Sequence, residues 1–184
     1  MSYSSLIRLG GLAPIVGGVL YAVASLLDSE GIQLVTFVLG LLSVLAVLVA
    51  LHLLQRERYG LPGMLAFVGA FVGVALVLGA FAGFPSFLGG DVVFLGADIY
   101  GVVAMLVATV GILALGFFTL QAGVLPRWGG WALIAGNPLL GIVLVLFGLE
   151  FLFGAWPVVV PWIVVGFAVF QAAGRRTERP ARVR

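Results

Sequence analysis

The chain has 184 residues, of which 63% are hydrophobic and only 9% are charged, with a formal net charge of +2. In soluble domains about a quarter of the residues are charged, and a soluble fold of this size could not bury so much apolar surface. The composition therefore excludes a soluble protein and indicates an integral membrane protein. The absence of cysteine and lysine excludes disulfides, thiolate metal sites and Schiff-base chemistry. The single histidine, His52, cannot supply the paired axial ligands of a typical membrane b-haem.

Six stretches are long and apolar enough to cross a bilayer, which takes about 20 residues. They cover residues 9–27, 32–54, 62–84, 98–121, 129–149 and 155–173. The predicted fold is therefore all-α: a polytopic membrane helix bundle with six transmembrane helices. Residues 1–173 are expected to form one transmembrane domain, followed by a basic tail at 174–184.

The charges predict how this bundle is oriented. All nine basic residues are arginines, and with six spans all nine fall on the same side. The positive-inside rule makes that side cytoplasmic, so both termini are expected inside. Arginine-only usage together with abundant Gly, Ala, Val and Leu is typical of high-GC prokaryotes, which predicts a prokaryotic plasma membrane. The opposite side receives five of the seven acids, namely Asp28, Glu30, Asp91, Asp98 and Glu150.

The first span contains a segment that returns later in the chain. RLGGLAPIVGGVL at 8–20 matches RWGGWALIAGNPL at 127–139 at seven of thirteen positions. This match favours a relation between the first and fifth spans. For the whole chain, three related helical hairpins and chance similarity in a low-complexity sequence both stay open. The first span also has the pattern of a signal peptide with an A-x-A ending at Ala24, but the repeat favours a retained helix.

The second, fourth and sixth spans share a glutamine at their cytoplasmic ends. The even spans end on Gln55, Gln121 and Gln171, which we expect to meet the last helical carbonyls at the interface. His52 lies at the same end of the second span and is expected to be an interfacial anchor rather than a ligand or base. Asp98 is expected to cap the start of the fourth span.

The third span and the loop after it carry weaker signals. Small residues four apart, at Gly69 and Gly73, predict that the third span packs closely against another helix. The long connection at 85–97 is apolar enough to dip into the membrane interface, and it is the best candidate for a lid.

The fifth span holds the candidate site, because Asn137 and Pro138 interrupt an otherwise apolar run. Proline removes a backbone donor, so it should free the carbonyl of Ile134 and permit a kink. One interpretation is a kinked packing helix in which Asn137 bonds to a neighbouring helix. The other is a broken helix that binds a solute or ion near mid-membrane. Glu150, about 29 Å along the same helix at about 1.5 Å per residue, would either reach water in a short loop or join such a site as a buried carboxylate.

After the sixth span, the tail GRRTERPARVR is strongly basic. Beside a membrane, its arginines are expected to contact anionic lipid headgroups at about 1 kcal/mol per charge. A nucleic-acid role is not expected for so short a tail. The arginines concerned are Arg175, Arg176, Arg179, Arg182 and Arg184.

No pattern typical of a catalytic, metal or cofactor site is found in the sequence, so an enzyme is not expected. Two functions stay open. One is an accessory, scaffold or lipid-contacting membrane module, alone, as a homo-oligomer or in a larger membrane complex. The other is a small transporter or channel for a small or hydrophobic solute. Convergence of Asn137, Glu150, Thr36, Ser43 and Thr109 on one cavity would favour the transporter, and separate contacts with neighbouring helices would favour the scaffold.

Overall fold

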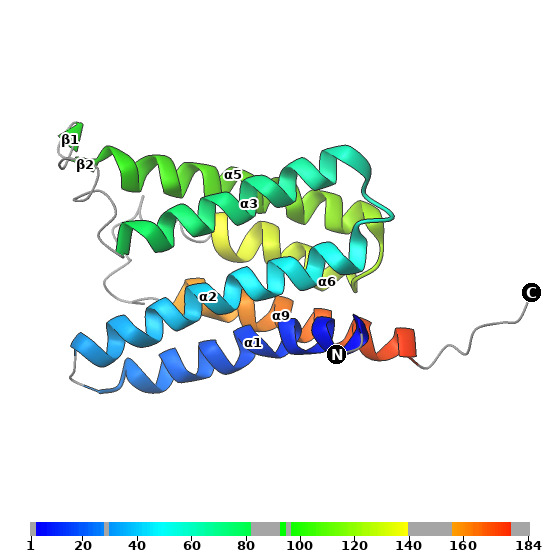
Figure 1. Cartoon of the computed structure of the whole chain (residues 1–184), viewed down its shortest axis with the longest axis horizontal. Coiled ribbons are helices and arrows are strands. Elements are labelled where there is room, and N and C mark those ends of the chain that lie inside the picture. Colours follow the sequence, from blue (N-terminus) through cyan, green and yellow to red (C-terminus); the bar gives the residue numbers. More distant parts are fainter. Residues whose placement is uncertain (1–2, 28–29, 82–92, 95–96, 140–155, 178–184) are drawn as a thin grey trace, which may run out of the picture.

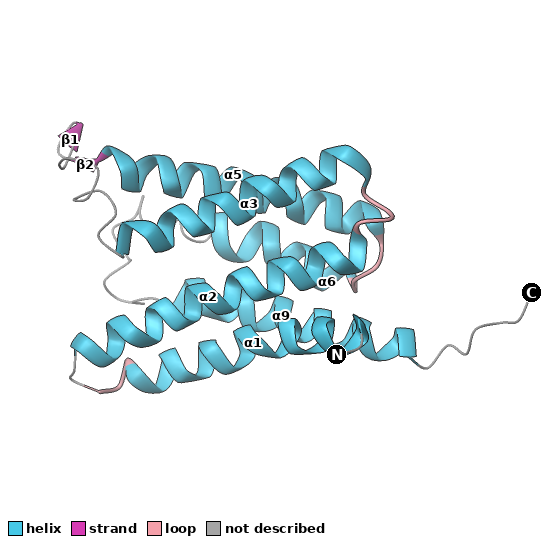
Figure 2. Cartoon of the chain, viewed as in Figure 1, coloured by secondary structure: helices cyan, strands magenta, loops and turns pink. Residues whose placement is uncertain are grey.

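A computed structural model describes residues 3–27, 30–81, 93–94, 97–139 and 156–177. The predicted all-α helix bundle is confirmed, since the described residues are helical apart from short connections and one two-residue antiparallel pair (Figure 2). The elements are α1 (Tyr3–Ala24), α2 (Glu30–Gln55), α3 (Gly60–Phe81), β1 (Val93–Phe94), β2 (Ala97–Asp98), α5 (Ile99–Ala122), α6 (Arg127–Trp131), the π-helix η1 (Ala132–Leu139) and α9 (Trp156–Thr177).

Four of these helices contain segments long and apolar enough to cross a membrane. The segments are Tyr3–Ala24, Leu34–Gln55, Gly60–Gly79 and Tyr100–Ala122. In the sixth predicted span, α9 contributes a shorter apolar helix, Val159–Arg175, and the fifth span runs beyond the described residues. The number of six spans therefore stays a prediction.

The contacts between helices close into a ring around the bundle, whose helices lie side by side in Figure 1. Each of α1, α2, α3, α5, η1 and α9 packs against the next in this order, and α9 packs against α1. Helix α2 also contacts α9 across the ring. Consecutive helices therefore form antiparallel pairs: α1 with α2, as expected for helices joined by a short connection, and α3 with α5, although a long connection joins these two.

Helix α1 approaches its two neighbours through consecutive glycines. A Cβ added at Gly10 would lie 2.5 Å from the Cβ of Ala50 in α2. A Cβ added at Gly11 would lie 2.8 Å from the backbone nitrogen of Phe170 and 2.9 Å from the carbonyl oxygen of Gly166, both in α9. The two faces of α1 therefore need glycine for backbone-to-backbone packing.

Glycines also bring α3 close to α5, as the small residues of the third span predict. A Cβ at Gly73 would meet the backbone of Ala108, and a Cβ at Gly111 would meet the backbone of Ala70. The close packing expected at Gly73 is thereby confirmed, with α5 as the partner helix. Gly69 faces the same crossing, where a Cβ would lie 3.5 Å from the Cα of Gly111.

Two prolines inside helices pack on glycines of the neighbouring element. A Cβ at Gly166 of α9 would lie 2.5 Å from Cγ of Pro14 in α1, and one at Gly136 of η1 would lie 2.5 Å from Cγ of Pro161 in α9. A proline inside a helix lacks the N–H of a helical hydrogen bond, and its ring takes up space at the helix surface. Glycine on the facing helix provides that room at both crossings.

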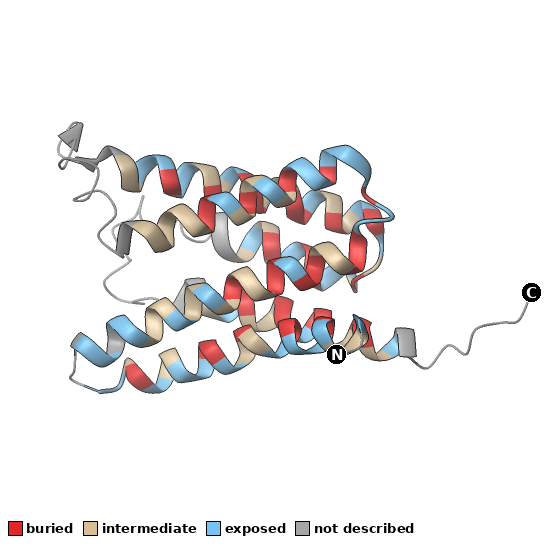
Figure 3. Ribbon diagram, in the orientation of Figure 1, coloured by how far each residue is buried: buried red, intermediate tan, exposed pale blue. Residues whose placement is uncertain are grey.

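Buried side chains are concentrated toward the end of the bundle that holds the N-terminus and the end of α9 (Figure 3). Among the α2 residues whose side chains are described, the buried ones fall between Val44 and Gln55, while on every long helix large apolar side chains also face outward. Such outward apolar side chains are what lipid contact requires. The centre of this core is formed by Leu48, Leu51, Leu115, Leu133, Val165 and Val169.

The described helices differ from the predicted spans mainly in length. Helix α1 begins at Tyr3 rather than residue 9, and α9 ends at Thr177 rather than 173, because both helices continue past their apolar stretches. Asp98 lies in β2, directly before α5. Of the connection at 85–97, only Val93–Phe94 and Ala97 are described, so its expected dip into the interface and its role as a lid lie largely outside the described residues.

Candidate functional site

The Asn137–Pro138 step lies in η1, where the chain leaves α-helical geometry. The π-helix follows α6 directly and covers the residues at which the sequence predicts a disturbed hydrogen-bond pattern. Such departures often mark functional positions in membrane helices. The side chains of Asn137 and Pro138 lie outside the described residues, as does the whole of Glu150, so neither interpretation of this site is tested by contacts.

The three other polar residues proposed for a transport cavity lie on two helices, Thr36 and Ser43 on α2 and Thr109 on α5. The hydroxyl of Thr36 donates to the carbonyl of Ile32 at 2.9 Å, and that of Ser43 donates to the carbonyl of Gly40 at 2.6 Å, both within α2. Thr109 is half-buried on α5. Hydroxyls that bond to their own helix need no polar partner across the bundle. The hydrogen bonds given above for Thr36 and Ser43 therefore stay within α2.

The basic residues, in contrast, gather at one end of the bundle. Arg8 lies near the start of α1, Arg56 and Arg58 lie in the α2–α3 connection, and Arg127 begins α6. Figure 1 shows these segments and the end of α9, which carries Arg175, at the same end. We call this the arginine end. It carries every arginine among the described residues.

Of the five predicted lipid-contacting arginines, the structure places two. Arg175 is exposed in the last turn of α9, and Arg176 follows it in the same helix with its side chain outside the described part. Arg179, Arg182 and Arg184 lie beyond the described residues.

At the arginine end, the α2–α3 connection forms a polar and aromatic cluster. The Tyr59 hydroxyl is hydrogen-bonded to Nδ1 of His52, and the His52 ring stacks on Phe67 of α3 with 4.3 Å between ring centroids. Tyr59 is only 7% exposed, and its burial raises the pKa of the phenol to about 12, so Tyr59 stays protonated at neutral pH. The expectation that His52 is a simple interfacial anchor is therefore incomplete, because its ring stacks on Phe67 and its Nδ1 is hydrogen-bonded to Tyr59.

Two glycines make this cluster possible. Gly60 has a φ of +60°, a left-handed conformation that reverses the chain between α2 and α3. A Cβ at Gly63 would lie 2.5 Å from the Cβ of Tyr59, so only glycine leaves room for the tyrosine to fold back over the first turn of α3.

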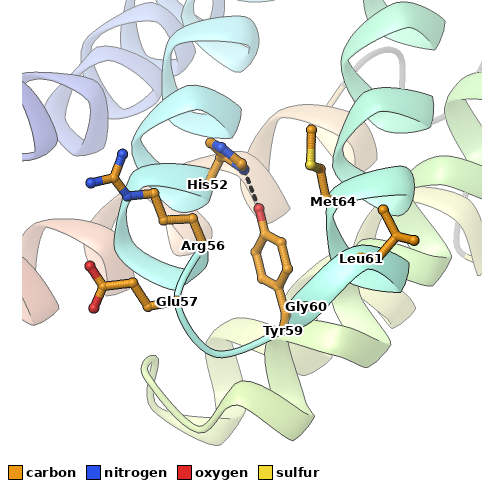
Figure 4. A pocket seen from close by; sticks show the side chains of 7 residues that line it. All are labelled: His52, Arg56, Glu57, Tyr59, Gly60, Leu61 and Met64. Atoms are coloured by element: carbon orange, nitrogen blue, oxygen red, sulfur yellow. Dashed lines mark hydrogen bonds between the residues drawn. The ribbon is translucent and has the colours of Figure 1, made fainter.

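An open hollow of about 630 Å³ adjoins the His52–Tyr59 pair (Figure 4). Its size is within the range of small-ligand sites, about 300–1,000 Å³. The lining side chains combine charged, aromatic and apolar groups. They are His52, Arg56, Glu57, Tyr59, Gly60, Leu61 and Met64.

One charged wall of the hollow is held by the first turn of α1. The Arg56 guanidinium carbon lies 5.6 Å from the centroid of the Tyr3 ring, a cation–π contact. The Tyr3 hydroxyl donates to the carbonyl of Leu53 at 2.6 Å, which fixes the ring beside the end of α2. Arg56 is thus oriented while its side chain stays exposed.

Directly beside this cluster, Gln55 joins α2 to α5. Gln55 is fully buried, and the hydroxyl of Thr119 donates to its Oε1 at 3.1 Å. Its Nε2 has no hydrogen-bond partner among the described residues. The expectation that the three glutamines lie at the interface is wrong for Gln55, because its side chain is buried in the core. Gln121 is exposed and Gln171 is half-buried. The three glutamines at the ends of the even spans therefore have different surroundings in the bundle.

The cluster at the α2–α3 connection has only a weak signal in the sequence. Its only local signal is the pattern Tyr59-Gly60-x-x-Gly63, which allows an aromatic side chain to fold over the start of a helix. Comparisons of this chain with protein families, with curated proteins and with solved structures find no match.

Proposed function

We propose that this chain is a packed, non-catalytic membrane module that contacts phospholipids and serves as an accessory or scaffold subunit. The observation that supports this function best is the closeness of the helix contacts. At Gly11 the backbones of α1 and α9 touch, and at Gly73 and Gly111 the backbones of α3 and α5 touch. Contacts of this kind leave no room for a polar pathway between these two pairs of helices.

The hydrogen bonds of Thr36 and Ser43 to their own helix support the same function. A transporter of polar cargo needs side chains that line a path and compensate the loss of water. Here these hydroxyls are already satisfied locally. The lipid contact is proposed for the arginine end, where Arg56, Arg58 and Arg175 are exposed, and for the basic tail.

We also propose that the chain is built of three related hairpins. Gly10 packs on α2, the helix that follows it, and its counterpart Gly129 packs toward Ala168 of α9, which again follows it. Gly11 packs on α9, and its counterpart Gly130 packs on Leu120 of α5. In both cases the partner is the second helix of a different hairpin. The matched glycines of the first and fifth spans thus have matched partners around the ring, which supports a relation between the hairpins that contain these two spans.

The proposed orientation is six spans in the plasma membrane of a prokaryote, with the arginine end in the cytoplasm. The chain has no cysteine, so single cysteines can report on each end. We expect Arg58→Cys to be protected from an impermeant maleimide in intact cells and Gly31→Cys, at the opposite end of α2, to be labelled. Labelling of both variants from the same face would overturn this topology.

A second candidate function is a small transporter or channel for a small or hydrophobic solute. The observation that favours it is the π-helix at Ala132–Leu139, because irregular helices near mid-membrane form binding sites in transporters. A hydrophobic cargo would not need the polar lining that the described helices lack. Asn137, Pro138 and Glu150 would be its candidate residues.

Native mass spectrometry of the protein, gently extracted from its own membranes, tests the first function against the second. We expect a reproducible partner subunit, or a homo-oligomer, carrying retained phospholipid. A monomer that carries a non-lipid small molecule would contradict the scaffold proposal and favour transport. The mass of that molecule would then identify the class of cargo.

A further inference from the structure

The hollow at the α2–α3 connection has two walls of opposite chemistry. Arg56 and Glu57, adjacent in the chain, contribute one positive and one negative charge. Leu61 and Met64, in the first turns of α3, contribute apolar side chains that are 68% and 50% exposed. In Figure 4 the charged pair lies on one side of the hydrogen-bonded His52 and Tyr59, and the apolar pair lies on the other.

The depth of the hollow in the membrane follows from the helices around it. The apolar segment of α2 ends at Gln55, immediately before Arg56, and the apolar segment of α3 begins at Gly60. The charged wall is thus at the level where headgroups begin, and Leu61 and Met64 lead back toward the hydrocarbon region. A ligand that carries both charge and apolar chains fits this position, and a phospholipid has that composition.

The charges of the hollow distinguish between kinds of phospholipid. Arg56 can bind a phosphate, which every phospholipid carries. Glu57 beside it would repel a lipid whose headgroup is only anionic, and it can accept charge-assisted hydrogen bonds from a primary ammonium. The quaternary ammonium of a choline lipid has no N–H group to donate.

We propose that this hollow is a binding site for an aminophospholipid, a zwitterionic lipid with a primary amine such as phosphatidylethanolamine. Arg56 contacts the phosphate, Glu57 contacts the ammonium, and the acyl chains run along Leu61 and Met64. This inference rests on the lipid contact proposed above and adds headgroup selectivity to it. The hydrogen-bonded Tyr59 and His52 lie between the charged pair and the apolar pair.

The test is native mass spectrometry of the full chain in mild detergent with three added lipids of identical acyl chains: phosphatidylethanolamine, phosphatidylglycerol and phosphatidylcholine. We expect the ethanolamine lipid to be retained about 5-fold better than the other two, the effect of an exposed charge pair. Glu57→Gln should remove this preference. The matched control Glu30→Gln, at the opposite end of α2, should keep it.

Arginine variants test the phosphate contact in the same experiment. Arg56→Gln should weaken retention of all three lipids, while Arg58→Gln, which removes the same charge two residues away but does not line the hollow, should leave the ethanolamine preference unchanged. Equal effects of these two variants would overturn the site in favour of a diffuse basic surface.

The two proposals fail in different ways. Retention of all three lipids without preference, or a preference that survives Glu57→Gln, overturns the aminophospholipid site and leaves the general lipid contact standing. Failure to retain any of the lipids overturns both.

Discussion

Replacing Gly11 with alanine is expected to lower the free energy of unfolding by about 2 kcal/mol, within the range for overpacked interiors. The added Cβ would lie 2.8 Å from the nitrogen of Phe170 and 2.9 Å from the oxygen of Gly166. Both are backbone atoms, so no side chain can rotate away, and α1 must separate from α9. Unfolding of the purified protein by increasing SDS in mixed micelles, followed by tryptophan fluorescence, measures the change.

Gly40→Ala is the matched control for this prediction. It adds the same methyl group to the middle of a spanning helix, but nothing lies within 4 Å of a Cβ at Gly40. Both variants gain the same helix propensity, about 1 kcal/mol over glycine, so their difference isolates the clash. Equal stability of the two variants would show that α1 and α9 are not in backbone contact.

Much of the fold can be predicted from the sequence, because bilayer thickness fixes the length of an apolar helix. The first four spans coincide with α1, α2, α3 and α5 to within a few residues, except that α1 begins at Tyr3. Helix ends are less predictable, since a helix can continue past the hydrocarbon region where its polar residues reach water. Arg8 and Arg175 lie in such extensions.

The order of helices around the ring could not be predicted. It depends on which glycine faces which partner, and Gly10 and Gly11 are adjacent in sequence but pack on different helices. One sequence contains no information on these pairings. For the same reason the contact between Gln55 and Thr119, 64 residues apart, has no signal in the chain.

The hollow at the arginine end could not be predicted either, for a different reason. His52 and Tyr59 are seven residues apart, and a regular helix would place them almost two turns from one another. They meet because the chain leaves the regular helix after Gln55, where the backbone nitrogens of Arg58 and Tyr59 both bond to the carbonyl of Gln55, and because Gly63 leaves space for the tyrosine. Recognising the site from sequence would require treating glycine as a partner of the preceding aromatic residue, and not only as a helix-packing residue.

Replacing Thr119 with valine is expected to destabilise the protein by about 2 kcal/mol, the cost of leaving buried polar groups without a partner. Valine keeps the shape of threonine but removes the hydroxyl that donates to Oε1 of Gln55. Since Nε2 of the same amide already has no partner among the described residues, the whole buried amide would then lack hydrogen bonds. The midpoint of thermal unfolding in detergent, with the SDS titration as a second measurement, reports the loss.

Gln55→Leu should behave differently, although it removes the other half of the same hydrogen bond. Leucine replaces a buried, partly unsatisfied amide by an apolar side chain of similar size, so the stability should change little or increase, with the Thr119 hydroxyl free to bond to its own helix. In the Gln55→Leu background, Thr119→Val should then cost less than about 0.5 kcal/mol, the range of a neutral substitution. Thr36→Val, at a hydroxyl that donates within α2, controls for the loss of a threonine. An additive double variant would show that Gln55 and Thr119 do not act as a pair, and that α2 and α5 are held together at this end by apolar contacts alone.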